Sequence, residues 1–359
     1  MARVTEGLKK AGAPIVIYAF ALDAGDPASP QRFAAQLPDD AQNAPARAAL
    51  NQMISPDEAF AESLNGIGAA TGYTLADDDG DDRVSVKAPI TQQGAPNALN
   101  YLPRYSYALR ALPLIESAST ASGALNLTPD RDGVFRSLPL VNHLGGETVP
   151  AIDLDALRAG LGAVVLHGAD GTVPGLDADA RLANISVGNT SIATRRDSAI
   201  TIWFARDPAA RVLDASSVLG ADVLPDLKNS IVIVAPPGKT VRTPVGLMSV
   251  GDIHAEVLEN ILLGEGLTQS AGYLPQLVFL AVTGAALIFL LARIGVVWSG
   301  ALTLALIAVA QSFGWMTFTS NHVLLDTATP SLALALCWMG GRAARLAGIA
   351  TARIGLKRS

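Results

Sequence analysis

The 359-residue chain is poor in the residues that build several classes of protein. It has a single cysteine, Cys337, which excludes a disulfide framework and a thiolate metal cluster. Only 16% of its residues are charged, against roughly 25% in an average soluble domain. The hydrolase motifs G-x-S-x-G and H-E-x-x-H are also missing. Half of the residues are apolar and the mean hydropathy is +0.34, so the chain has few groups that interact with water.

The charges are distributed unevenly. Residues 271–359 hold six of the 26 basic residues and one of the 32 acids, a net charge of +5. Residues 1–270 hold the other 20 basic and 31 acidic residues, a net charge of −11. Because nucleic acids attract clustered Lys and Arg, we expect no nucleic-acid partner for this acidic part.

Three apolar runs follow one another in the C-terminal part. They cover residues 273–292, 294–318 and about 322–341, and the first two contain no charged residue. A bilayer core needs roughly 20 helical residues, so the runs predict three transmembrane helices within residues 271–345, with the lipid bilayer as partner. Three buried helices of a soluble protein are the alternative interpretation. A basic tail, residues 346–359, comes after them.

Basic residues predict the orientation of these helices. Arg293 lies between the first two runs, residues 319–322 contain no Lys or Arg, and five basic residues occur from Arg342 onward. Since basic loops stay in the cytoplasm, Arg293 and the tail are expected inside the cell and residues 1–270 outside it.

The N-terminal part begins with an apolar run over residues 13–22 that is rich in β-branched and aromatic residues. Such a run predicts a buried strand. A signal peptide is the alternative, because Lys9 and Lys10 precede the run and residues 19–21 resemble a small-residue cleavage site.

Further strands and helices are expected along residues 1–270. Residues 184–204 predict a hairpin and following strand around a Gly188-Asn189 turn, residues 230–235 a fully buried strand, and the stretch after Pro150 a helix. Strands alternating with helices favour an α/β domain, and the hairpin adds antiparallel strands. The predicted fold is therefore a mixed-sheet, layered α/β domain attached to three transmembrane helices.

A charged turn stands out at residues 128–140, TPDRDGVFRSLPL. Its candidate ligand contacts are Arg131, Asp132 and Arg136, because two aspartates and two arginines within seven residues can bind an anion or a metal. The alternative is an internal salt-bridged turn, the more common role of such a cluster.

Two other stretches resemble ligand-binding motifs but do not have the residue spacing that those motifs need. The acidic loop at residues 75–82 lacks the Gly and Glu that an EF-hand needs at its sixth and twelfth positions. The PPGKT stretch at residues 236–240 lacks the first glycine of a phosphate-binding loop, since Ile233 stands in its place. We therefore expect no metal site, no catalytic residues and no cofactor.

Residues 251–264 predict an amphipathic helix that ends at Gly264. Its apolar face contains Ile253, Val257, Leu258, Ile261 and Leu262. Asp252, Ile253, Val257 and Ile261 are candidates for signal transmission, together with the link to residue 272. His254 stands in the first turn, where it can sense protons or contact a ligand, or serve as a structural histidine.

The order of these segments resembles one family. PDRDGVFRSLPL, LKNSIVIVA, the Thr243-Pro244 pair and GDIHAEVLENILLGEGL, followed by three predicted spans, are similar to the second CHASE type of extracellular sensory domain, over most of residues 10–345. The resemblance implies a bacterial receptor in the cytoplasmic membrane, with residues 1–270 periplasmic or extracellular.

The same resemblance implies partners and three departures. Its members pass a small-molecule or protein signal to a cytoplasmic nucleotide cyclase or protein kinase, and their pairing implies a homodimer. The family leads us to expect an N-terminal anchor before the first strand, an aspartate near the end of that strand, and an output domain after the spans. The sequence as given departs from each: no anchor precedes the strand, residues 18–20 are Tyr, Ala and Phe with Asp23 just beyond, and no output domain follows Ser359. The predicted function is therefore the sensory and membrane portion of a receptor whose effector is not in this sequence: a receptor half, a truncated gene product, or a partner for a separate effector.

Two other functions were weighed. A membrane-anchored hydrolase needs a nucleophile, a base and an orienting acid, and His143, His167 and His254 are its candidate bases. A structural assembly subunit, which tethers a partner through its spans, has no sequence feature that separates it from a receptor.

Overall fold

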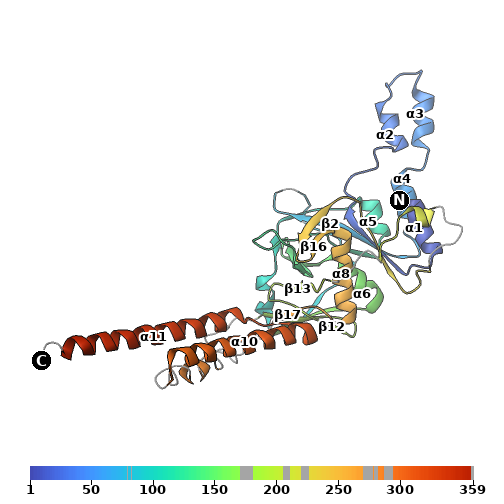
Figure 1. Cartoon of the computed structure of the whole chain (residues 1–359). Helices are drawn as coiled ribbons and strands as arrows, with labels where there is room; N and C mark the ends of the chain where they lie inside the picture. The colour runs from blue at the N-terminus through green and yellow to red at the C-terminus, as the bar shows by residue number, and fades with distance from the viewer. Residues whose placement is uncertain are drawn as a thin grey trace. The chain divides into compact units, whose positions relative to one another are not determined.

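The computed structural model describes all residues except 79, 82, 170–180, 205–210, 220–225, 270–277, 279–281, 287–293 and 357–359. The chain divides into two compact units, Met1–Gly266 and Leu267–Ser359, and each is described by itself. Figure 1 shows the elements of both, coloured along the chain.

A five-stranded mixed sheet forms the centre of the first unit. β14 (Ile231–Val234), β1 (Ile15–Ala21), β2 (Gly68–Ala76) and β6 (Ala121–Ala124) are parallel in that order. β5 (Tyr107–Leu109) pairs with β2 in the antiparallel direction. The strand predicted at residues 13–22 is confirmed as β1.

The expectation of a fully buried strand at residues 230–235 is corrected by β14. The strand forms as predicted, but all four of its residues are half-buried rather than fully buried. Its position explains this, because β14 pairs only with β1 among the described residues and lies at the edge of the sheet. An edge strand keeps one side open to solvent or to loops.

Three helices cover one face of this sheet. They are α1 (Ala2–Lys10), α4 (Pro56–Ser63) and α5 (Pro113–Ala118). Val16 and Tyr18 of β1 point to this face and pack with Phe60 in one buried cluster. The Thr5 hydroxyl lies 2.7 Å from the Tyr18 hydroxyl. Burial raises the pKa of Tyr18 to about 12, although this hydrogen bond acts in the opposite direction.

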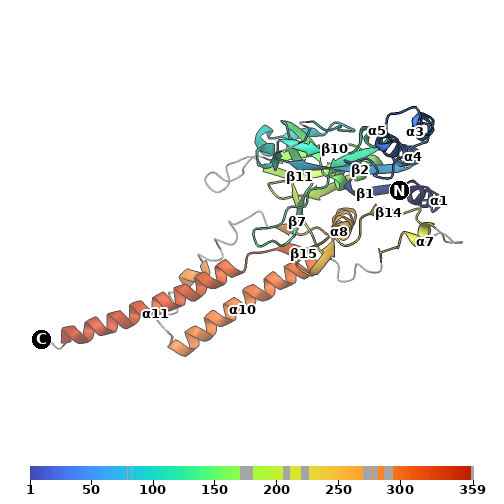
Figure 2. The ribbon, with the colours of Figure 1, turned by 90° about the horizontal axis from the view of Figure 1, so that it is seen from above.

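The opposite face is covered by α6 (Ile152–Leu161) and α8 (Val250–Leu263). Ile17 of β1 points to these helices, as expected from the alternation of side chains along a strand. Figure 2 shows α8 and α5 on opposite sides of the sheet. The helix predicted after Pro150 is confirmed as α6.

A second sheet packs on the far side of these two helices. Its order is β12 (Thr190–Ala193), β11 (Arg181–Val187), β10 (Val164–Ala169) and β3 (Thr91–Gly94). α6 contacts β11 and α8 contacts β12, so the helices form a layer between two sheets. This arrangement is the layered mixed-sheet α/β fold predicted from the sequence.

The hairpin prediction for residues 184–204 is confirmed in part. β11 and β12 form it around Gly188 and Asn189, but β13 (Ala199–Thr201) pairs with β7 (Ser137–Pro139) instead. The remaining elements of this unit are α2 (Pro30–Gln36), α3 (Ala44–Asn51), η1 (Pro96–Tyr101), α7 (Ser216–Leu219), β4 (Arg104–Tyr105), β8 (Val141–Leu144), β9 (Glu147–Pro150), β15 (Thr240–Thr243) and β16 (Gly246–Ser249).

The second unit contains two long helices, α10 (Val296–Asn321) and α11 (Ala328–Leu356). Within the described part of the chain, α10 is the one helix long and apolar enough to cross a membrane. The first predicted span, residues 273–292, falls mostly outside the described residues. The third predicted run contains the start of α11, with Pro330 in its first turn as expected.

A short strand pair joins the start of this unit to the end of α10. β17 (Thr268–Gln269) runs parallel to β18 (Val323–Leu324), and the Thr268 N–H donates to the His322 carbonyl at 2.9 Å. His322 ends α10 in the left-handed conformation, with φ 52°. The sequence analysis did not predict this pairing.

Candidate functional site

Local chemistry fixes both ends of α8. At its start, the Ser249 hydroxyl accepts the Asp252 N–H, and the Asp252 carboxylate accepts the Ser249 N–H, which completes a capping box. At its end, Gly264 adopts the left-handed conformation with φ 70°, as a C-terminal cap requires. The helix predicted at residues 251–264 is confirmed, and Asp252 lies in its cap.

The apolar face of α8 packs into the largest core of the domain. Ile253, Val257 and Ile261, which were expected to transmit a signal, are 0–2% exposed and pack in one cluster with Ile17 of β1. Leu262 was expected on the same face, but half of its side chain is exposed. The helix turns it away from the core, since it follows Ile261 by 100° of rotation.

A buried ion pair or hydrogen bond joins α8 to α6. His254 Nδ1 lies 2.8 Å from Asp153 Oδ2, and both side chains are completely inaccessible to solvent. Asp153 Oδ1 and His254 Nε2 have no hydrogen-bond partner among the described residues. His254 is therefore inside the domain, and a ligand in solvent does not reach it without an opening of the fold.

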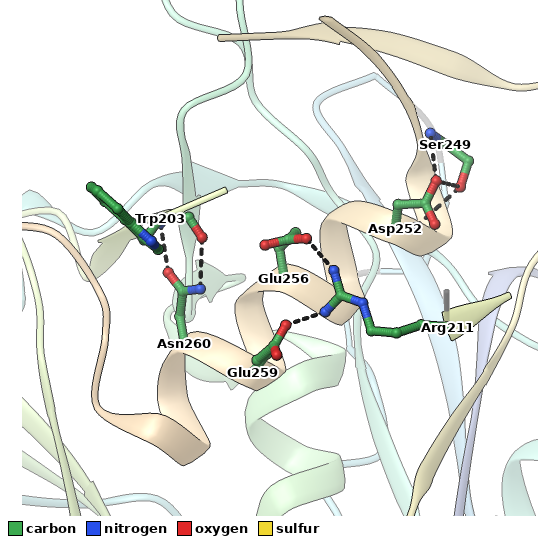
Figure 3. A network of polar contacts seen from close by, with 7 residues as sticks. All are labelled: Trp203, Arg211, Ser249, Asp252, Glu256, Glu259 and Asn260. Carbon is green, nitrogen blue, oxygen red and sulfur yellow. Dashed lines mark hydrogen bonds and ion pairs between the residues drawn. The ribbon is translucent and has the colours of Figure 1, made fainter. Parts of the chain in front are cut away.

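Arg211 forms ion pairs with the next turn of α8. Arg211 pairs with Glu256, which is completely buried, and with Glu259, which is partly exposed (Figure 3). The pKa of Arg211 is raised. Burial of the guanidinium acts to lower it, but the hydrogen bonds and charges of the two glutamates outweigh that effect.

In the last turn of α8, the side-chain amide of Asn260 is hydrogen-bonded to the backbone of Trp203. The Asn260 side chain accepts the Trp203 N–H at 2.6 Å and donates to the Trp203 carbonyl at 2.9 Å (Figure 3). A side-chain amide thereby pairs with both backbone groups of one residue, as a neighbouring strand does. α8 is thus attached to three separate segments through His254, Glu256 and Asn260, each at most 3% exposed.

The charged turn at residues 128–140 forms its own set of ion pairs. Arg136 donates to Asp130 at 2.7 Å and to Asp132 at 2.8 Å. The hydrogen bond from Arg136 is the main reason why the pKa of Asp132 falls to about 2, and the same contacts raise the pKa of Arg136. Arg131 is exposed. The arginine and aspartates thus pair with one another, as the salt-bridged interpretation expects.

This turn docks on the strand that follows β14. The Phe135 N–H donates to the Arg242 carbonyl of β15 at 2.8 Å. No hydrogen bond or ion pair among the described residues joins Arg131, Asp132 or Arg136 to His254. The two groups of candidate contacts are therefore not in direct polar contact with each other.

The remaining histidines do not complete a catalytic triad in the described part of the chain. His167 Nε2 lies 2.9 Å from the Ser186 hydroxyl, but no carboxylate is hydrogen-bonded to this histidine. His143 Nδ1 contacts the Glu147 carbonyl. The described residues also hold no group of three or more His, Cys, Asp or Glu suited to a metal ion.

The first unit is thus a layered α/β domain in which α8 makes buried polar contacts, and a helical C-terminal unit follows it. Comparison with protein families makes this specific. The CHASE2 domain family matches residues 1–297, and the chain belongs to that family. CHASE2 is a sensory domain of signalling proteins and not a catalytic one. Curated proteins and solved structures gave no match.

Proposed function

We propose that the chain is the sensory and membrane portion of a receptor in the bacterial cytoplasmic membrane. Residues 1–270 face the outside and bind a small molecule or a protein. Three transmembrane helices carry the signal to a cytoplasmic nucleotide cyclase or protein kinase, and the receptor works as a homodimer. The matched family supports the sensory role, and the apolar α10 supports membrane insertion.

The observation that carries the proposal is the pairing of β17 with β18. It brings Thr268, where the chain leaves the sensory domain, to the C-terminal end of α10. α10 begins at Val296 and its 26 residues measure about 39 Å. The chain from residue 270 to 295 must therefore cover the length of that helix. A first span antiparallel to α10 meets this requirement, and it keeps Thr268 and the α10–α11 loop on the same outer side.

α8 is the proposed relay inside the sensory domain. Its N-terminal turn lies at the carboxyl end of β14, where a Cβ on Gly251 would meet the Ala235 Cβ at 2.6 Å. In open α/β sheets this edge is where ligands usually bind. The helix is about 21 Å long and ends five residues before β17 begins. A change at the strand ends therefore reaches the membrane link through one rigid element.

The charged turn that contains Arg131, Asp132 and Arg136 is the proposed ligand contact. Arg131, which is exposed, and the pair of Asp132 with Arg136 lie on a turn beside β15, so an anionic ligand there would compete with Asp132 for Arg136. His254 is buried, and it fits a change in packing between α6 and α8 better than direct contact with a ligand. A ligand shifts such an equilibrium only if its affinity differs between the two states.

A reporter chimera tests the function. A cyclase catalytic domain fused after Ser359 should give cyclic nucleotide output that depends on the medium outside the cell. Arg211→Met should change that response, because it removes the contacts to Glu256 and Glu259. Arg47→Met is the matched control. Arg47 lies on α3 and forms an ion pair with Asp39, and the variant should respond like the wild type. Identical output under all conditions that alter the parent cell would refute the proposal.

A further inference from the structure

The C-terminal ends of α6 and α8 lie toward the amino-terminal edge of the central sheet. Along α6, Asp155 contacts the Ser122 N–H and Arg158 contacts the earlier Thr120 carbonyl, so the helix runs antiparallel to β6. α8 starts at the opposite, carboxyl edge and extends along the same face. The two helices are joined near their starts by Asp153 and His254. We call residues 159–163 and 262–264 the shared helix end.

The shared helix end presents an uncharged, apolar surface. Leu161, Leu262 and Leu263 are 43%, 50% and 60% exposed. All eight of its residues are exposed and none is charged, since they are Ala, Gly and Leu. The part of the chain that contains them, residues 1–270, has a net charge of −11. Large exposed apolar side chains without charges mark an interaction surface.

The chain itself limits the distance from this surface to the membrane unit. Leu263 precedes Thr268 by five residues, which span at most about 17 Å when fully extended. The Thr268 N–H is bonded to the carbonyl of His322, the residue that ends α10. Only the short link of residues 264–267 therefore separates the end of α8 from the strand pair at the end of α10, the helix that is apolar enough to cross a membrane.

We infer that the shared helix end rests on the outer lipid surface. This inference depends on the proposed membrane insertion of α10. The three leucines enter the boundary between head groups and acyl chains, where burial of apolar side chains stabilises a peripheral contact. The eight residues themselves carry no Asp or Glu that anionic lipids would repel, and the first acid, the half-buried Glu265, follows directly after Gly264. The contact fixes the position of α8 relative to the bilayer.

Site-specific fluorescence quenching in nanodiscs tests the contact with the full chain. In a Cys337→Ser background, a bimane probe is attached to Leu262→Cys or Leu263→Cys, and the lipids carry spin labels near the head group. The matched control is Leu247→Cys on β16, which is 73% exposed and precedes the start of α8. Val309→Cys on α10, 64% exposed, reports membrane insertion with spin labels deep in the acyl chains.

The contact predicts a blue shift and loss of most fluorescence at residues 262 and 263, with little loss at residue 247. Quenching at residue 309 but equal weak quenching at residues 247, 262 and 263 would overturn the contact and leave the membrane proposal intact. No quenching at residue 309 would overturn both.

Discussion

His254 on α8 and Asp153 on α6 form a pair that is completely buried, with 2.8 Å between Nδ1 and Oδ2. The two residues are 101 positions apart in the sequence. Removing one partner of a buried pair leaves the other polar group without compensation and usually costs about 3–5 kcal/mol. The pair therefore links the two helices of the central layer.

We expect Asp153→Ala and His254→Ala each to lower the free energy of unfolding by about 3 kcal/mol or more. The double variant should lose less than the sum of the two, because the second change removes a group that is already unpaired. Urea unfolding of the full chain in detergent, followed by circular dichroism, measures all four members of the cycle. Additive losses would show that the two residues act independently.

Asn260→Leu tests the attachment of α8 to the segment after β13. The variant keeps the side-chain volume but removes both hydrogen bonds to the Trp203 backbone. We expect a loss of about 1–3 kcal/mol in stability, the range for a buried polar contact, and a changed emission of Trp203. Asn51→Leu on the exposed α3 is the control. A stability equal to that of the wild type would mean that the amide contributes nothing.

The pair of Asp132 with Arg136 predicts a pH dependence. Because the pKa of Asp132 is lowered to about 2 from an ordinary 3.8, its ion pair stabilises the fold at neutral pH. This stabilisation decreases as the pH falls from about 4 toward 2. Asp132→Asn should therefore lower the unfolding temperature slightly at pH 7, and the difference from the wild type should shrink toward low pH. The exposed Asp78→Asn is the control, and a difference independent of pH would contradict the pairing.

Several features of this structure follow from local sequence. The C-terminal end of α8 was predicted because Gly264 caps the helix locally, whereas the capping box of Ser249 and Asp252 at its start, also a local feature, was not predicted. The pairing of Arg136 with Asp132 spans four residues and was one of the two interpretations weighed. Contacts of this range depend on the chain nearby and little on the rest of the fold.

The buried polar contacts of α8 could not be predicted in the same way. Asn260 meets Trp203 across 57 positions, and Arg211 meets Glu256 across 45. A polar residue in an amphipathic pattern is expected on the solvent side, yet Glu256 and Asn260 are buried. Their burial depends on which segment the fold places beside α8, and a single sequence does not contain that information.

Thr268→Pro tests the strand pair at the entrance to the membrane unit. Proline has no N–H, so the variant loses the hydrogen bond to the His322 carbonyl. In the reporter chimera we expect output that no longer follows the external medium. Thr268→Val keeps the N–H and should respond like the wild type. A normal response of the proline variant would show that the signal does not pass through this pair.

The orientation of the chain is the claim on which the receptor function depends. In a Cys337→Ser background, single cysteines at Leu247 in the sensory domain and at Ile354 near the C-terminus can be treated with a membrane-impermeant maleimide in intact spheroplasts. We expect labelling of residue 247 in intact cells, and of residue 354 only after lysis. Labelling of residue 354 in intact cells, or protection of residue 247, would contradict the proposed orientation.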